Sequence, residues 1–371
     1  MSSRLFSPLQ LRSLTLPNRI VISPMCQYSA VEGNANDWHL LHFGQYAVSG
    51  AGLFIIEATA VEPEGRITPE CLGLWNDENE AALRRVLDTV RPFASMPFGI
   101  QLGHAGRKAS VRRPGLGRGS LTPEEGAWQT KGPSTRPYGP GWPIPQALDR
   151  AGMQRVIQAF VRAAQRADRL GLDLLEIHAA HGYLLSSFLS PLANDRTDEY
   201  GGSQINRMRF PLEVFAAVRE VWPHHKPMGV RFNGSDWNDA GLTLQDGIAF
   251  ANELKRGGCD YVDISSGGNA PSRIPLRPGY QVPFATGIKQ AVDITTMCVG
   301  LIRDPHHAEA IVANQEADLV GIGRGMLNNP RWAWHAAEAL GAPFEVPHQY
   351  LRGATSEGVP SQDMVMVKDP V

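Results

Sequence analysis

The 371-residue sequence predicts an α/β protein, and within that class a single (β/α)8 TIM barrel. Eight short stretches rich in Val, Ile, Leu and Phe recur along the chain, and most are separated by a segment in which apolar residues have helical spacing. Several of these stretches are apolar at every position, as strands buried on both faces of a parallel sheet require. Eight such β-then-α units close most economically into a barrel. A doubly wound open sheet is the alternative.

The expected strands, in chain order, span residues 19–23, 53–58, 97–102, 174–178, 228–232, 261–265, 295–300 and 319–323. Helical spacing is clearest in residues 153–170, 205–222 and 244–256, each of which is followed by a glycine or a proline. Asp304 followed by Pro305 predicts the start of a further helix, because these are favoured residues for the cap and the first helical position.

One connection is far longer than a single helix needs. Residues 103–147, after the third expected strand, carry 9 glycines and 7 prolines in 45 positions, too many for a helix or strand interior. We expect this segment to be an excursion over the barrel that serves as a lid or substrate wall. Residues 1–352 are expected to form one domain. Residues 353–371 have little apolar pattern and are expected to form a loose C-terminal tail.

The composition narrows the choice of partners. With 35 basic and 37 acidic residues the net charge is −2, which offers no electrostatic footprint for nucleic acid or anionic lipid. No apolar run approaches the ~18 residues that span a bilayer, and the N-terminus does not have the pattern of a signal peptide. A cytoplasmic protein acting on small molecules is expected. The four cysteines lie far apart in the sequence and are expected to be lone thiols: Cys26, Cys71, Cys259 and Cys298.

In a barrel of this kind, function is concentrated where the strands end, so polar residues and glycines at those positions matter most. Gly323, Arg324 and Gly325 follow the last expected strand. Glycine amides approach an anion closely and a guanidinium adds paired donors, so this segment predicts a phosphate site. The alternative is that the glycines only make tight turns and that Arg324 is a surface residue.

His178 and His181 lie at the end of the fourth expected strand, and Tyr183 follows them. A zinc site is one reading, although the spacing is not that of a helical zinc motif and no third ligand is near in sequence. Structural histidines are a second reading. The third is a pair of imidazole donors that polarise a carbonyl or nitro group. Tyr183, with an expected pKa near the usual value of about 10, would then be a proton donor.

Several motifs together give a more specific indication. They are LPNRI at 16–20, PMCQY at 24–28, NDWH at 36–39, QLGHAGRK at 101–108, HAAHGY at 178–183, NDRTDEYGGS at 194–203, Arg231, and GIGR at 321–324. In these motifs the chain resembles the Old Yellow Enzyme family of flavin ene-reductases, and within it the thermophilic-like subclass that includes the xenobiotic reductases. The resemblance extends over residues 5–352.

This resemblance implies FMN held non-covalently at the C-terminal mouth of the barrel. The residues it assigns to the cofactor are Pro24, Met25, Cys26, Ala60, Gln101, Arg231, Ser265, Gly300, Gly323 and Arg324. Cys26 would tune the flavin potential and so act in catalysis; a small buried hydrophobic residue is the alternative. Gln101 and Arg231 would bind the pyrimidine side, and Arg231 would stabilise negative charge on the reduced ring. Four of these residues would hold the ribityl phosphate: Ser265, Gly300, Gly323 and Arg324.

The resemblance also implies a reaction. NADPH would reduce FMN and leave, and an activated alkene such as an enone, enal, maleimide or nitroalkene would then take a hydride from flavin N5 at Cβ. His178 and His181 would anchor the substrate oxygen, and Tyr183 would protonate Cα. Tyr28 and Arg352 would shape the substrate site, Arg352 from the neighbouring subunit of a homodimer or homotetramer. No metal is expected.

Three alternatives remain at this point. The dienoyl-CoA reductase and amine dehydrogenase branch adds an iron–sulfur cluster, for which this chain lacks clustered cysteines. A barrel aldolase or isomerase usually needs a Schiff-base lysine or a carboxylate base at a strand end, and none of the six lysines ends an expected strand. A non-catalytic flavin-binding protein would bind FMN without turnover.

Overall fold

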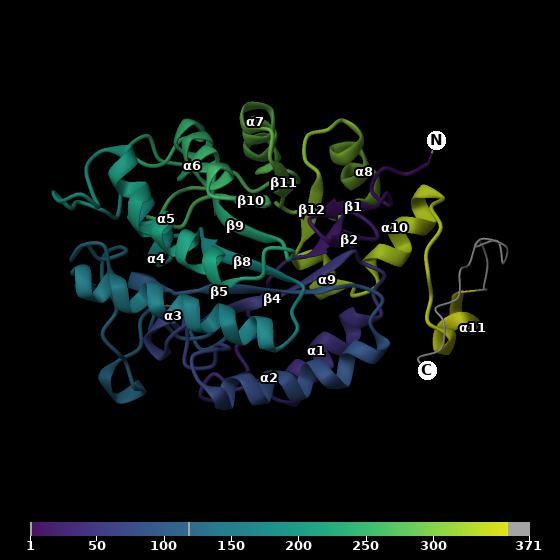
Figure 1. The fold of residues 1–371 in the computed structure, drawn as a ribbon, viewed down its shortest axis with the longest axis horizontal. Coiled ribbons are helices and arrows are strands. Elements are labelled where there is room, and N and C mark those ends of the chain that lie inside the picture. The colour runs from purple at the N-terminus through teal and green to yellow at the C-terminus, as the bar shows by residue number, and fades with distance from the viewer. Residues whose placement is uncertain (1, 118, 355–371) are drawn as a thin grey trace.

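Eight parallel strands form a closed barrel in the computed structural model, which describes residues 2–117 and 119–354 (Figure 1). The barrel strands are β3 (Ile20–Ile22), β4 (Leu53–Ala60), β5 (Phe98–Gly103), β8 (Leu174–Ala179), β9 (Met228–Asn233), β10 (Tyr261–Ser265), β11 (Thr295–Cys298) and β12 (Leu319–Ile322). They follow this order around the barrel, and β12 pairs with β3 to close it. The barrel prediction is confirmed, and the open-sheet alternative is wrong.

Helices surround the barrel, as Figure 1 shows. They are α1 (Asp37–Ala47), α2 (Asp77–Val90), α3 (Arg150–Arg169), α4 (Leu184–Leu189), α5 (Gln204–Val221), α6 (Leu244–Arg256), α7 (Val282–Val292), α8 (Pro305–Ala313), α9 (Arg324–Asn328) and α10 (Trp332–Leu340). The expected helix start at Asp304 is confirmed, because its side chain accepts a hydrogen bond from the backbone N–H of His306 at 2.9 Å. The three helices expected from apolar spacing correspond to α3, α5 and α6.

The barrel strands bury two separate sets of apolar side chains. In β8, Leu175 and Ile177 pack in the outer cluster between the barrel and its helices, whereas Leu174 belongs to a second cluster inside the barrel. A hairpin of β1 (Leu9–Leu11) and β2 (Leu14–Leu16) adds Leu11 and Leu16 to that inner cluster and covers this end of the barrel. Because side chains alternate along a strand, the next inward positions of β8 after Leu174 lie closer to the opposite end, the mouth.

Residues 103–147 form the irregular excursion that their composition predicted. This segment contains the short 3-10 helices η3 (Gly106–Lys108) and η4 (Pro123–Glu125) and the two-residue strands β6 (Lys131–Gly132) and β7 (Gln146–Ala147). Glu62, which follows β4, helps to attach the segment to the barrel loops. It pairs with Lys131 and contacts His104 Nε2 at 2.8 Å.

The chain leaves the barrel after α10. The segment that follows, which we call the C-terminal arm, contains η5 (His348–Tyr350) and α11 (Leu351–Ala354) and extends away from the barrel in Figure 1. Of the expected tail, residues 353 and 354 end α11, and residues 355–371 lie outside the described residues.

Candidate functional site

The strand ends meet at a cavity of about 240 Å³. Residues from the C-terminal halves of five strands, or from the loops that follow them, line this cavity, which we call the mouth cavity: Pro24, Met25, Arg231, Ser265, Gly300, Gly323 and Arg324. His181 lines it as well. A second, much smaller cavity is lined by Ala60, His178 and Tyr183. The fold therefore brings together most of the residues that sequence analysis assigned to one site.

His178 and His181 lie next to each other, with ring centroids 5.0 Å apart and planes at 86°. Burial, followed by the charge of Arg231, lowers the pKa of both imidazoles well below the usual value, so both rings are neutral at pH 7. His178 Nδ1 accepts the backbone N–H of Ala180 at 3.2 Å, which leaves Nε2–H as the donor of that ring. His181 Nε2 lies 2.6 Å from Ser265 Oγ.

Tyr183 completes this group, with its ring centroid 5.0 Å from that of His178. Burial raises the pKa of Tyr183 well above the usual value, so the expectation of a pKa near 10 is wrong. The reason is desolvation, which penalises a phenolate in a closed site. The phenol is therefore firmly protonated at neutral pH.

Lys108 also reaches this group, and sequence analysis did not assign it a role. Its Nζ donates to the backbone oxygen of His181 at 2.6 Å and lies 5.2 Å from the centre of the Tyr183 ring. Burial lowers the pKa of Lys108 to about 8. Lys108 belongs to η3 of the excursion, and the excursion's Tyr138 lies on its other side, with the ring centre 4.7 Å from Nζ. The quoted motif HAGRK contained Lys108, but its position relative to the histidines depends on the tertiary fold.

The side of the mouth cavity formed after β3, β11 and β12 has the features of an anion cradle. Gly300 has φ +128°, in the region that favours glycine. A Cβ on Gly321 would lie 2.8 Å from Ser23 Oγ, so only glycine allows this close approach. Among the described residues, Ser23 Oγ is buried without a hydrogen-bond partner. Arg324 lines the same cavity. A phosphate-bearing ligand matches these donors.

Below the mouth, a layer of buried polar side chains fills the barrel. Gln101 Nε2 donates to Glu176 Oε1 at 2.8 Å, and the Tyr261 hydroxyl donates to Glu176 Oε2 at 3.0 Å. Arg231 Nε lies 3.0 Å from Asp263 Oδ2. Sequence analysis found Gln101 and Arg231 but missed the two carboxylates. Their inward positions, two residues before His178 and Ser265 in otherwise apolar strands, were the available indication.

All four cysteines are free thiols, as their sequence spacing predicted. The tertiary fold nevertheless brings Cys71 beside Cys26, and a hydrogen bond with Cys71, followed by burial, raises the pKa of the Cys26 thiol. Cys26 is therefore protonated at neutral pH. Tyr28, two residues on, has φ +50° and is partly buried; burial raises its pKa as well.

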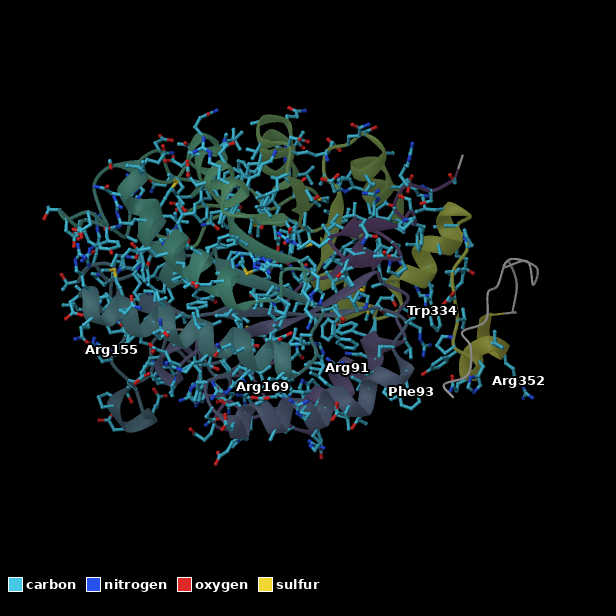
Figure 2. The ribbon with its side chains drawn as sticks, in the orientation of Figure 1. Arg91, Phe93, Arg155, Arg169, Trp334 and Arg352 are labelled. Carbon is cyan, nitrogen blue, oxygen red and sulfur yellow. The ribbon has the colours of Figure 1, made fainter. Side chains whose placement is uncertain are left out.

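Arg352 lies apart from the other assigned residues. It is exposed, it belongs to α11, and Figure 2 shows it at the outer end of the C-terminal arm, pointing away from the barrel. Within one subunit it does not belong to the group at the mouth.

Fold and site together define an α/β-barrel protein whose strand ends carry an anion cradle, a buried arginine and a neutral imidazole pair. Residues 4–342 match the NADH:flavin oxidoreductase / NADH oxidase family, and the chain belongs to that family. It is 44% identical over 355 residues to the NADPH dehydrogenase of Geobacillus thermodenitrificans (strain NG80-2), covering 95% of this chain and 99% of that protein. The chain is therefore a flavin oxidoreductase that uses a nicotinamide dinucleotide.

Other relatives agree. The NADPH dehydrogenase of Listeria innocua serovar 6a is 44% identical over 352 residues, covering 94% of this chain and 99% of that protein. Among solved structures, morphinone reductase is 30% identical, with a TM-score of 0.77 and coverage of 93% of this chain and 91% of that one. A 2-naphthoyl-CoA reductase has a TM-score of 0.81 at 22% identity, covering 91% of this chain and 52% of that chain, and shows the shared fold alone.

In the part of the chain that the structure describes, no helix is both long and apolar enough to span a membrane. Nor do three or more His, Cys, Asp or Glu side chains gather there in a way that could hold a metal ion.

Proposed function

We propose that this protein is an FMN-dependent ene-reductase that uses NADPH to reduce the C=C bond of α,β-unsaturated carbonyl or nitro compounds. One observation carries the proposal: His178, which is buried, and His181 and Tyr183, which are partly buried, form one group, and all three are uncharged at neutral pH. Neutral imidazole donors polarise a substrate oxygen without a competing counter-ion. A protonated phenol beside them is a source for the proton that the alkene needs.

The residues at the mouth suit FMN. Ser23 Oγ is a buried donor without a partner among the described residues, and Arg231 lines the same cavity. The cavity beside Gly300, Gly321 and Gly323 leaves room for a phosphate. Further contacts are proposed for Pro24, Met25, Cys26, Ala60, Gln101, Ser265 and Arg324. When bound, FMN supplies the chemistry of taking a hydride from NADPH and giving it to the alkene.

The chain's own residues have distinct roles in this proposal. His178 Nε2–H and His181 bind the carbonyl or nitro oxygen, which draws electron density from Cβ. Tyr183 holds the proton that is added at Cα, and Lys108 holds the backbone of His181 in position. Tyr28 forms part of the substrate site.

The subclass and the assembly are also proposals. The motifs around Cys26 and Tyr28 support assignment to the thermophilic-like ene-reductases. We propose a homodimer or homotetramer in which Arg352 enters the substrate site of a neighbouring subunit. Its exposed position at the end of the C-terminal arm supports this arrangement, as do the exposed apolar side chains of Trp38, Leu41 and Phe93 on α1 and η2 (Arg91–Phe93).

The test of the proposed function begins with the absorbance spectrum of the purified protein, which is expected to be that of bound FMN. NADPH oxidation is then measured anaerobically with and without 2-cyclohexenone, and the product is identified. We expect saturated ketone in amounts equal to the NADPH consumed. A colourless protein that does not bind added FMN, or bound FMN without ketone formation, would contradict the proposal.

A further inference from the structure

Two buried carboxyl groups lie inside the barrel, beneath the mouth cavity. Glu176 in β8 and Asp263 in β10 are both completely buried. Arg231 of β9 lies between these strands, where its backbone is paired with His178 of β8 and Asp263 of β10. The charged groups that act most strongly on Glu176 are Asp263 and Arg231.

One guanidinium cannot neutralise two carboxylates. Leaving both ionised would put an uncompensated negative charge in a low-dielectric interior, so one carboxyl keeps its proton. Asp263 has the direct ion pair, at 3.0 Å from Arg231 Nε. The hydrogen-bond partners of Glu176 among the described residues are both neutral, the amide of Gln101 and the phenol of Tyr261. The proton therefore belongs on Glu176.

The titration behaviour agrees with this assignment. Burial and the negative charge of Asp263 raise the pKa of Glu176 to about 8, against the opposing effects of Arg231, Gln101 and Tyr261. Burial raises the pKa of Asp263 to about 6, and Arg231 opposes that rise. At pH 7 the cluster thus holds one cation, one anion and one neutral acid.

These contacts also set which atoms face a ligand above. Because the Gln101 Nε2 is used by Glu176, the amide Oε1 is left as the acceptor of Gln101. Because Arg231 Nε faces Asp263, its two terminal nitrogens are left as donors. An acceptor beside two donors is complementary to an imide edge, with one N–H between carbonyl oxygens.

Resting on the function proposed above, we propose that Glu176 is a positioning residue beneath the flavin whose protonation is linked to flavin reduction. At neutral pH Glu176 already holds a proton. At alkaline pH it takes up a proton when the flavin is reduced. Below the titration range, FMN takes up two electrons and one proton and becomes an anion, while Glu176 is already protonated. Above that range, the ionised Glu176 gains a proton in the same event, because the new anion beside Arg231 favours its neutral form. Two electrons are then accompanied by two protons.

The test is the midpoint potential of the holoenzyme between about pH 6 and pH 10. In the native protein the slope against pH is expected to double above about pH 8, from one proton per two electrons to two. Glu176→Gln keeps a neutral side chain, whose amide oxygen can accept from Gln101 and whose amide nitrogen can donate to the Tyr261 hydroxyl oxygen. This variant is expected to keep the one-proton slope throughout. Asp318→Asn is the matched control, because Asp318 precedes β12 at the opposite end of the barrel. The slope of its midpoint potential against pH should double above about pH 8, as in the native protein. Equal slopes in the native protein and Glu176→Gln would overturn the proposal.

A second measurement does not depend on FMN. Infrared difference spectra between neutral and alkaline pH, on cofactor-free protein, should show loss of a protonated carboxylic acid C=O band that is missing in Glu176→Gln. The same band in both proteins would place the proton elsewhere and overturn the proposal. Failure of the protein to bind FMN would instead contradict the proposed function and leave the infrared result to decide the state of Glu176.

Discussion

At the scale of residues, the site combines neutral donors with permanent positive charges. Burial keeps His178, His181 and Tyr183 uncharged, whereas Arg231 and Arg324 stay charged because a guanidinium is protonated at all physiological pH values. A negative charge that develops at the mouth therefore meets guanidinium groups and several neutral hydrogen-bond donors. This distribution suits a reaction in which charge appears only transiently on the substrate.

Tyr183→Phe tests the proton donor. We expect alkene reduction to slow by about 10²- to 10⁴-fold, the usual range for removing a general acid, while flavin reduction by NADPH keeps its rate. Stopped-flow measurement of the two half-reactions separates these effects. Tyr46→Phe, which removes a buried hydroxyl without a partner in α1, is the control and should change neither rate. Equal slowing of both half-reactions by Tyr183→Phe would remove it from the proposed role.

His178→Ala tests the oxygen-binding role. Phenols, whose oxygen would lie between the two imidazoles, should bind roughly 5- to 150-fold more weakly, which corresponds to a lost hydrogen bond of about 1 to 3 kcal/mol. Titration of the flavin absorbance measures the dissociation constant. Phenol affinity equal to that of the native protein, in a variant with unchanged melting temperature, would show that the imidazole does not bind the oxygen.

At the scale of elements, each strand divides its side chains between the outer core and the barrel interior. Gly229 of β9 shows how tightly the interior layers fit, because a Cβ there would lie 2.2 Å from Tyr261 Cε1. The absent side chain lets the Tyr261 ring lie across β9 and reach Glu176. A glycine in a strand interior thus makes the carboxyl layer possible.

Gly229→Ala should therefore lower the free energy of unfolding by about 1 to 3 kcal/mol, through overpacking against a buried ring. Gly247→Ala is the matched control in α6, where the nearest atom to a new Cβ is Ile288 Cδ1 at 3.5 Å. Removing a helix-interior glycine there should raise the same quantity by about 0.5 to 1 kcal/mol. Urea unfolding followed by tryptophan fluorescence measures both; a Gly229→Ala variant as stable as the native protein would contradict this account of Tyr261.

Glu62 links the excursion to the barrel and makes that link sensitive to acid. Burial opposes its ionisation, but hydrogen bonds and charge from His104 and Lys131 prevail and lower its pKa to about 2. A lowered carboxyl pKa adds stability above the unfolded value, and this is lost as the pH falls from about 4.5 towards 2. The loss amounts to about 3 kcal/mol. Glu62→Gln should be less stable at pH 7 and show a flatter loss over that range, measured by urea unfolding; identical pH profiles would contradict this role.

At the scale of the whole molecule, different segments of the chain cover the two ends of the barrel. The hairpin of β1 and β2 covers one end with Leu11 and Leu16, and the excursion brings Lys108 and Tyr138 to the other. The C-terminal arm lies outside the barrel, with Arg352 at its outer end (Figure 2). The hairpin thus closes one end of the barrel, and the residues of the proposed site lie at the other.

Mixing two variants, each expected to be impaired in alkene reduction, tests the shared site. Arg352→Ala leaves Tyr183 intact, and Tyr183→Phe leaves Arg352 intact. If Arg352 acts in a neighbouring subunit, reassembled mixed oligomers should contain some sites with both residues and regain alkene reduction above the sum of the separate variants. Size-exclusion chromatography with light scattering confirms the assembly. Activity that is only additive in verified mixed oligomers would contradict the exchange of Arg352 between subunits.

The sequence by itself determined the barrel, because periodic burial is a local property: strands such as Leu319–Ile322 are apolar throughout, and Asp304 with Pro305 begins α8. It also determined the mouth residues that follow the strands, since parallel strands end at the same edge. Only the tertiary structure placed Cys71 beside Cys26 and Lys108 beside His181, because these pairs come from segments far apart in the chain. It also decided the charges of Glu176 and Tyr183, since a pKa depends on burial and neighbouring charge, which sequence order does not specify.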